Sequence, residues 1–171
     1  MNSDVLKAGG AKVGEDSSGM PAVALSVKDK DEFYKITKKI SNMDQEFKKI
    51  AITDLNLDLY NPRLPKSKQG KDETTIIEYL LLEASTLELM ESIGENDFFA
   101  GEMLLVIPND NGKYIVVEGN RRLTAVKLLN DPTIATVKKV AAKDIADAAK
   151  YKPVELPCLQ FPSREDIQRF I

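Results

Sequence analysis

The spacing of apolar positions predicts a domain in which helices and strands are mixed. Apolar residues recur every three or four positions in several segments, which predicts amphipathic helices over about 31–42, 73–83, 85–93, 120–129, 142–150 and 163–171. Runs rich in β-branched and other apolar residues predict strands at 50–57, 104–107, 114–117 and 154–161. The turn Asn109-Asp110-Asn111-Gly112 joins the two middle strands as a hairpin. We therefore expect an α+β fold, with a small mixed sheet and flanking helices.

Local signals refine these elements. The alternation slips after Ile52, which predicts a bulge or bend, and Pro157 predicts that the last strand lies at a sheet edge. Two serines stand three residues before an acidic residue, which predicts capping boxes at Ser85 with Glu88 and at Ser163 with Asp166.

The ends of the chain differ from its middle. Residues 1–20 contain four glycines and no aromatic residue, so we expect a flexible tail, followed by a helical extension over 21–45 and a domain over 46–171. The last predicted helix is only about two turns long, and its apolar face has no expected partner. We therefore expect a further segment after Ile171.

Composition excludes several classes of protein. Histidine is absent, which removes Ser-His-Asp and Cys-His catalysis and histidine-ligated zinc. The single cysteine, Cys158, excludes a disulfide scaffold and fits a reducing cytoplasm. No apolar run approaches the roughly 18 residues of a membrane span. With 24 basic and 27 acidic residues the net charge is −3, so we do not expect this part of the chain to grip DNA by its overall charge.

The placement of two arginines points to an anion. The strand at 114–117 leads through Glu118 and Gly119 into a helix that begins with Arg121 and Arg122. A helix N-terminus carries a partial positive charge, so cations there are unfavourable by about 0.3–1 kcal/mol each. A bound phosphate would reverse this, because backbone amides and guanidinium groups would converge on it. The alternative is that the arginines pair with Glu118 or another carboxylate, or reach solvent.

Two motifs in the same order resemble one family. The run Gly119-Asn120-Arg121-Arg122-Leu123-Thr124-Ala125 resembles the Gly-Glu-Arg-Arg-x-x-Ala box of the ParB/sulfiredoxin superfamily, and Asn61-Pro62-Arg63-Leu64-Pro65-Lys66 resembles its Asn-Pro-x-Gln-Pro-Arg box. The resemblance covers about residues 50–130.

The resemblance implies a nucleotide-binding domain of a cytoplasmic, bacterial protein that acts on or near DNA. ParB proteins use CTP with Mg²⁺ to close as dimeric clamps on DNA, and the label of the family often says nuclease. The implied ligand is therefore a nucleoside triphosphate, CTP or ATP, with Mg²⁺. A homodimer fits the resemblance, and DNA contact would come through a segment after Ile171. The candidate phosphate or nucleotide ligands are Asn61, Arg63, Gly119, Asn120, Arg121, Arg122 and Thr124.

The sequence also departs from the family. Asn120 replaces the glutamate of the box, and an amide cannot act as a general base. Asn120 suits a helix N-cap, and Glu118 could supply the missing catalytic or metal-binding carboxylate. The reactive cysteine of the sulfiredoxin box has no counterpart here. Cys158 lies far from it and is expected to be a small buried residue. Asp97 and Glu102 are either magnesium ligands or exposed.

Three functions remain open at this point. The first is a nucleotide-binding domain that holds phosphate at residues 119–122. The second is a phosphotransfer or nuclease enzyme that uses Glu118. The third is a protein-interaction module without a ligand, in which internal carboxylates neutralise the arginines and no cleft lies beside them.

Overall fold

The structure, a computed structural model, describes residues 28, 30–32, 34–35, 45–83 and 85–171. Contacts within the chain separate two units, Met1–Met43 and Asp44–Ile171. The described residues of the first unit are helical, in the region where a helical extension is expected. The predicted tail over 1–20, and the apolar residues Phe33, Ile36 and Ile40 of the helix predicted over 31–42, lie outside the described residues.

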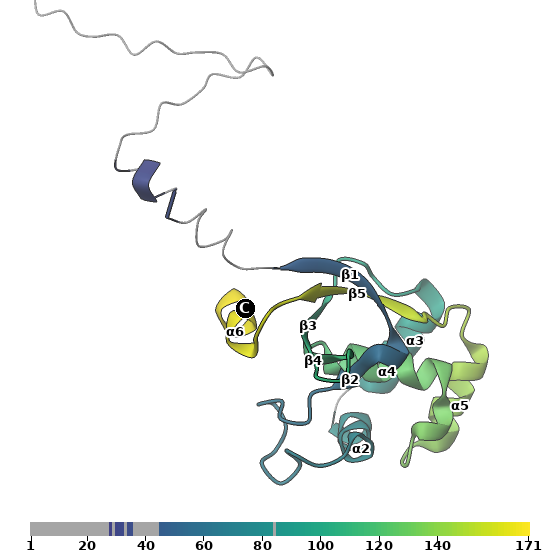
Figure 1. The fold of residues 1–171 in the computed structure, drawn as a ribbon. Helices are drawn as coiled ribbons and strands as arrows, with labels where there is room; N and C mark the ends of the chain where they lie inside the picture. The colour runs from purple at the N-terminus through teal and green to yellow at the C-terminus, as the bar shows by residue number, and fades with distance from the viewer. Residues whose placement is uncertain (1–27, 29, 33, 36–44, 84) are drawn as a thin grey trace, which may run out of the picture. The chain divides into compact units, whose positions relative to one another are not determined.

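The second unit is an α+β fold built on a five-stranded mixed sheet (Figure 1), as the apolar pattern predicts. Its strands are β1 (Glu46–Ala51), β2 (Leu55–Leu57), β3 (Leu104–Pro108), β4 (Tyr114–Glu118) and β5 (Glu155–Gln160). They follow the order β1-β5-β3-β4-β2. The pairs β1/β5 and β3/β4 are antiparallel, and β3/β5 and β2/β4 are parallel.

The first two strands lie at opposite edges of the sheet, although only the short helix η1 (Ile52–Asp54) separates them. Three residues reach about 10 Å at most, so the two edges must approach each other and the sheet curls. The N–H of Ile52 donates to the carbonyl of Val154 at 2.9 Å and fixes this crossing. The slip in alternation after Ile52 is therefore a change of sheet edge, which is larger than the predicted bulge or bend.

The prediction that β5 is an edge strand is wrong, because β5 lies between β1 and β3. Pro157 is nevertheless tolerated. It faces Lys49 of β1, and the parallel pairing with β3 begins only at Cys158. At Pro157, β5 is therefore paired with β1 but not yet with β3, so the proline can lack an N–H without breaking the pairing with β3.

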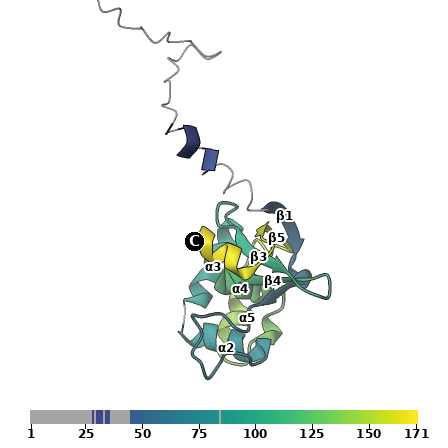
Figure 2. The ribbon, with the colours of Figure 1, turned by 60° about the vertical axis from the view of Figure 1, so that its left-hand side comes forward.

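Helices cover both faces of the sheet (Figures 1 and 2). One face carries α2 (Glu73–Glu83), α3 (Thr86–Asn96), α4 (Asn120–Asn130), η2 (Pro132–Ile134) and α5 (Lys139–Ala148). These elements share the main core, whose fully buried side chains include Leu55, Leu81, Met90, Leu123 and Leu156. The other face carries α6 (Arg164–Phe170), and a smaller core there contains Leu105, Val117, Phe161 and Ile167.

The two predicted capping boxes have different outcomes. Ser163 caps α6 as predicted, because its Oγ accepts the N–H of Asp166 at 3.3 Å. Ser85 occupies the N-cap position of α3, but its side chain makes no capping hydrogen bond, so that prediction is wrong. The expectation of an unpartnered last helix is also wrong in part, since Ile167 of α6 is fully buried.

Among the described helices, none has the length and apolar character that crossing a bilayer requires.

Candidate functional site

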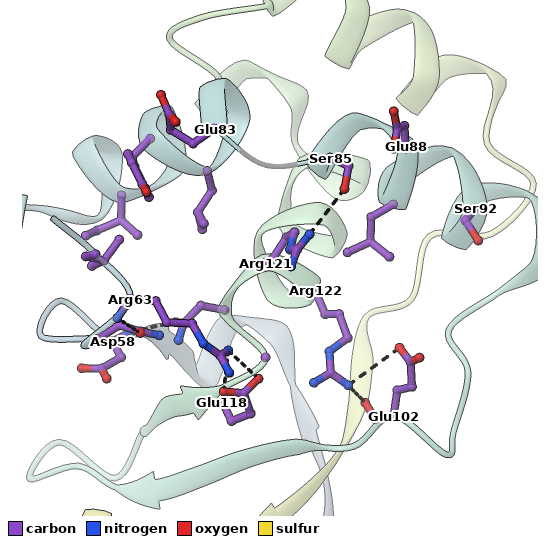
Figure 3. A pocket seen from close by; sticks show the side chains of 18 residues that line it. Asp58, Arg63, Glu83, Ser85, Glu88, Ser92, Glu102, Glu118, Arg121 and Arg122 are labelled. Carbon is purple, nitrogen blue, oxygen red and sulfur yellow. Dashed lines mark hydrogen bonds and ion pairs between the residues drawn. The ribbon is translucent and has the colours of Figure 1, made fainter. Parts of the chain in front are cut away.

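A pocket of about 790 Å³ lies where the loop after β2, the facing ends of α2 and α3, and the start of α4 meet (Figure 3). This volume falls within the usual range for small-molecule sites. One wall is mainly apolar and contains Leu64, Ile76, Tyr79, Leu80 and Leu89. The lining also includes three arginines, Arg63, Arg121 and Arg122. It contains five acidic residues as well, Asp58, Glu83, Glu88, Glu102 and Glu118, so the pocket combines an apolar surface with charged groups of both signs.

The helix start at the base of the pocket requires a glycine. Gly119 is the N-cap of α4, with φ of +107°, a conformation that other residues adopt only with strain. A Cβ atom at this position would lie 2.4 Å from Cδ2 of Leu104. In the described part of the chain no side chain caps this helix start, so its first amide groups are donors without an intrahelical acceptor. Backbone donors and the helix dipole thus meet at the pocket, as the sequence predicts.

The three arginines have different partners. Arg63 Nη1 donates to both carboxylate oxygens of Glu118, at 2.9 and 2.8 Å. Arg122 Nη1 donates to the backbone carbonyl of Glu102 at 2.5 Å and lies 3.8 Å from the Glu102 carboxylate.

Arg121 has only a long, uncharged contact, from its Nη1 to Ser85 Oγ at 3.4 Å, and it forms no ion pair with any described residue. Internal carboxylates therefore neutralise two of the three arginines, whereas Arg121 has no ion-pair partner among the described residues, although Glu83 and Glu88 line the same pocket.

Asn120 has a structural position instead of the predicted N-cap role. It is the first residue of α4 and is buried. Its Oδ1 accepts the backbone N–H of Asp58 at 2.9 Å, and its Nδ2 donates to the carbonyl of Val116 at 2.8 Å. Because both ends of the amide are occupied, Asn120 joins β2 and β4 to α4 at the base of the pocket.

Sequence reasoning missed the buried ion pair of Asp58 and Arg164. The Asp58 side chain is almost fully buried, and its two oxygens accept from Arg164 Nη1 at 2.6 Å and Nη2 at 2.9 Å. Hydrogen bonding to Asp58 raises the pKa of Arg164. Through this pair, α6 on one face of the sheet is tied to the lining of the pocket on the other. The only signal in the sequence is an acidic residue directly after a short apolar strand.

Of the two remaining candidate phosphate ligands, Asn61 lies at the pocket and Thr124 does not. Asn61 lines the pocket, and its Oδ1 also accepts the backbone N–H of Arg63 at 2.9 Å, which shapes the loop. Thr124 is fully buried and does not line the pocket, so the structure does not bring it together with the other candidate ligands. Its Oγ1 has no hydrogen-bond partner among the described residues.

The carboxylates near the pocket do not assemble a metal cage. Among the described residues, no group of three or more His, Cys, Asp or Glu side chains could hold a metal ion. Glu118 and Glu102 both line the pocket, but each faces an arginine. Asp97 and Glu102, the other candidate magnesium ligands, are both exposed.

Cys158 is the small buried residue that the sequence predicts. It lies in β5, fully buried, and its thiol donates to the carbonyl of Leu156 at 3.4 Å. Burial raises the pKa of the thiol to about 12. Such a thiol is neutral and unreactive at physiological pH.

Comparisons of this chain with protein-family models, with curated proteins and with solved structures found no match.

Proposed function

We propose that the pocket binds the phosphates of a nucleoside triphosphate, CTP or ATP, and that residues 46–171 form a ParB/sulfiredoxin-like domain. The observation that carries the proposal is Arg121. It is an exposed arginine without an ion pair among the described residues, and it stands in the first turn of α4 beside a 790 Å³ pocket. A cation at a helix N-terminus is unfavourable in isolation and becomes favourable when an anion joins it.

The rest of the pocket supports a ligand that is larger than phosphate alone. Tyr79, Leu80 and Leu89 give the lining of the same pocket an apolar surface that a nucleobase can contact. The hypothesis of a ligand-free module expects neutralised arginines without a cleft, whereas here a pocket lies beside an arginine that is not neutralised. A nucleotide would use both the apolar part of the lining, through its base, and Arg121, through its phosphates.

The experiment is calorimetric titration of the chain with CTP, ATP, GTP and UTP in the presence of Mg²⁺. We expect one triphosphate to bind the wild type. Arg121→Ala should weaken that binding about 10- to 100-fold, the range for loss of a charged hydrogen bond. The matched control is Arg169→Ala, which removes an exposed arginine that does not line the pocket. Absence of binding, or equal binding by the wild type and Arg121→Ala, would overturn the proposal.

The resemblance to ParB extends the proposal to DNA and to a homodimer. The net charge of −3 means that DNA contact would require a local patch or another segment. Fluorescence anisotropy of labelled duplex DNA, with and without the triphosphate, tests the DNA part, and sedimentation under the same conditions tests the homodimer.

A second candidate function is phosphotransfer or nuclease chemistry that uses Glu118. The observation in its favour is that the Glu118 carboxylate lines the pocket immediately before Gly119. This function predicts that the wild type hydrolyses the triphosphate or cleaves DNA when Mg²⁺ is present. Glu118→Gln should abolish that activity. Turnover that survives Glu118→Gln would exclude Glu118 as the catalytic carboxylate.

A further inference from the structure

Two consecutive arginines of the pocket differ in the contacts that they make with the protein's own groups. Arg121 and Arg122 are consecutive in α4 and both line the pocket. Figure 3 shows that Arg121 extends toward Ser85, whereas Arg122 extends toward Glu102 on the opposite side. A phosphate at Arg121 would therefore displace no ion pair among the described residues, but a group that reaches Arg122 meets the Glu102 carboxylate as well.

Glu102 holds Arg122 in two separable ways. The shorter contact, at 2.5 Å, comes from its backbone carbonyl and does not depend on its side chain. The carboxylate lies further away, at 3.8 Å, and its side chain is 60% exposed, compared with 20% for Arg122. The carboxylate thus neutralises the guanidinium but is free to move into solvent, while the carbonyl keeps the arginine in place.

We propose that Glu102 determines affinity for extended phosphate chains, by competing with the ligand for Arg122. The inference rests on the proposed function, because it places a second phosphate position in the same pocket. A chain of phosphates bound at Arg121 reaches Arg122 and displaces the Glu102 carboxylate, whereas orthophosphate bound at Arg121 leaves the pair intact. Exposed ion pairs are weak, and phosphate accepts from guanidinium groups as well as carboxylate does, so the exchange is feasible.

The test compares inorganic tripolyphosphate with orthophosphate, without Mg²⁺ and at fixed ionic strength, by NMR titration of the ¹⁵N-labelled chain. Glu102→Gln preserves the backbone carbonyl and the size of the side chain. We expect it to tighten tripolyphosphate binding about fivefold, which corresponds to the weak pair it removes, and to change orthophosphate binding less than twofold. Glu95→Gln is the matched control, because Glu95 is an exposed glutamate of α3 outside the pocket lining.

A double-mutant cycle separates competition from a general effect of charge. In the Arg122→Ala background, Glu102→Gln should no longer tighten tripolyphosphate binding, because the group under competition is gone. Equal effects of Glu102→Gln and Glu95→Gln, or an undiminished effect in the Arg122→Ala background, would overturn the role of Glu102 and leave the proposed function standing. If neither phosphate binds the wild type or any variant, the proposed function fails together with this inference.

Discussion

The backbone N–H of Asp58 donates to the side-chain oxygen of Asn120 at 2.9 Å, across 62 positions of the sequence. The same Asn120 side chain donates to Val116, and the Asp58 carboxylate binds Arg164. One buried amide and one buried carboxylate therefore connect β2, β4, α4 and α6 directly beneath the pocket. The position of the arginines at the start of α4 depends on this buried polar network.

The first prediction concerns Asn120. Asn120→Ala leaves the N–H of Asp58 and the carbonyl of Val116 without their partner in a buried region, so we expect the free energy of unfolding to fall by about 2–3 kcal/mol. Urea denaturation followed by circular dichroism measures this change. The control is Asn96→Ala, which removes an exposed side chain whose one hydrogen bond among the described residues is to the carbonyl of Ser92 in its own helix, and it should cost less than about 1 kcal/mol. Equal losses in the two variants would show that the amide link has no special importance.

The second prediction concerns Gly119. Gly119→Ala both strains a residue with φ of +107° and places a Cβ atom 2.4 Å from Leu104. We expect destabilisation of about 2–5 kcal/mol, since left-handed strain costs about 1–2 kcal/mol and overpacking about 1–3 kcal/mol. Gly112→Ala is the control, because Gly112 has φ of +69° with no atom within 4 Å of the added Cβ, so it reports strain alone. Thermal unfolding of both variants separates the cost of backbone strain from the cost of overpacking. A smaller loss of stability for Gly119→Ala than for Gly112→Ala would contradict overpacking against Leu104.

The third prediction concerns Cys158 and pH. Burial raises the pKa of this thiol from 9.0 to about 12, so above pH 9 the unfolded chain loses the proton while the folded chain keeps it. The thiol therefore contributes stability that is present below pH 9 and is lost as the pH rises toward 12. We expect the free energy of unfolding to fall less steeply over this range in Cys158→Ala than in the wild type. Parallel slopes for the two proteins would contradict the raised pKa.

Most of the second unit's elements could be predicted from local patterns. The hairpin of β3 and β4 follows from two apolar runs around Asn109-Asp110-Asn111-Gly112, and both strands occur there. The cap at Ser163 also follows, because its partner Asp166 lies within the same turn of chain. The predictions that failed concern residues whose surroundings come from distant parts of the chain. Pro157 belongs to an interior strand because β1 pairs on its far side, and the Ser85 hydroxyl receives Arg121 instead of capping α3.

The amino-acid sequence determined that a strand ends in a glycine and continues as a helix bearing two arginines, because turn geometry and helix electrostatics act over a few consecutive residues. It could not determine which arginine keeps its charge. Arg63 pairs with Glu118 across 55 positions and Arg122 with Glu102 across 20, and only the folded chain brings these groups together. The tertiary structure alone decided that Arg121 forms no ion pair with any described residue, since long-range packing sets which charges are neighbours.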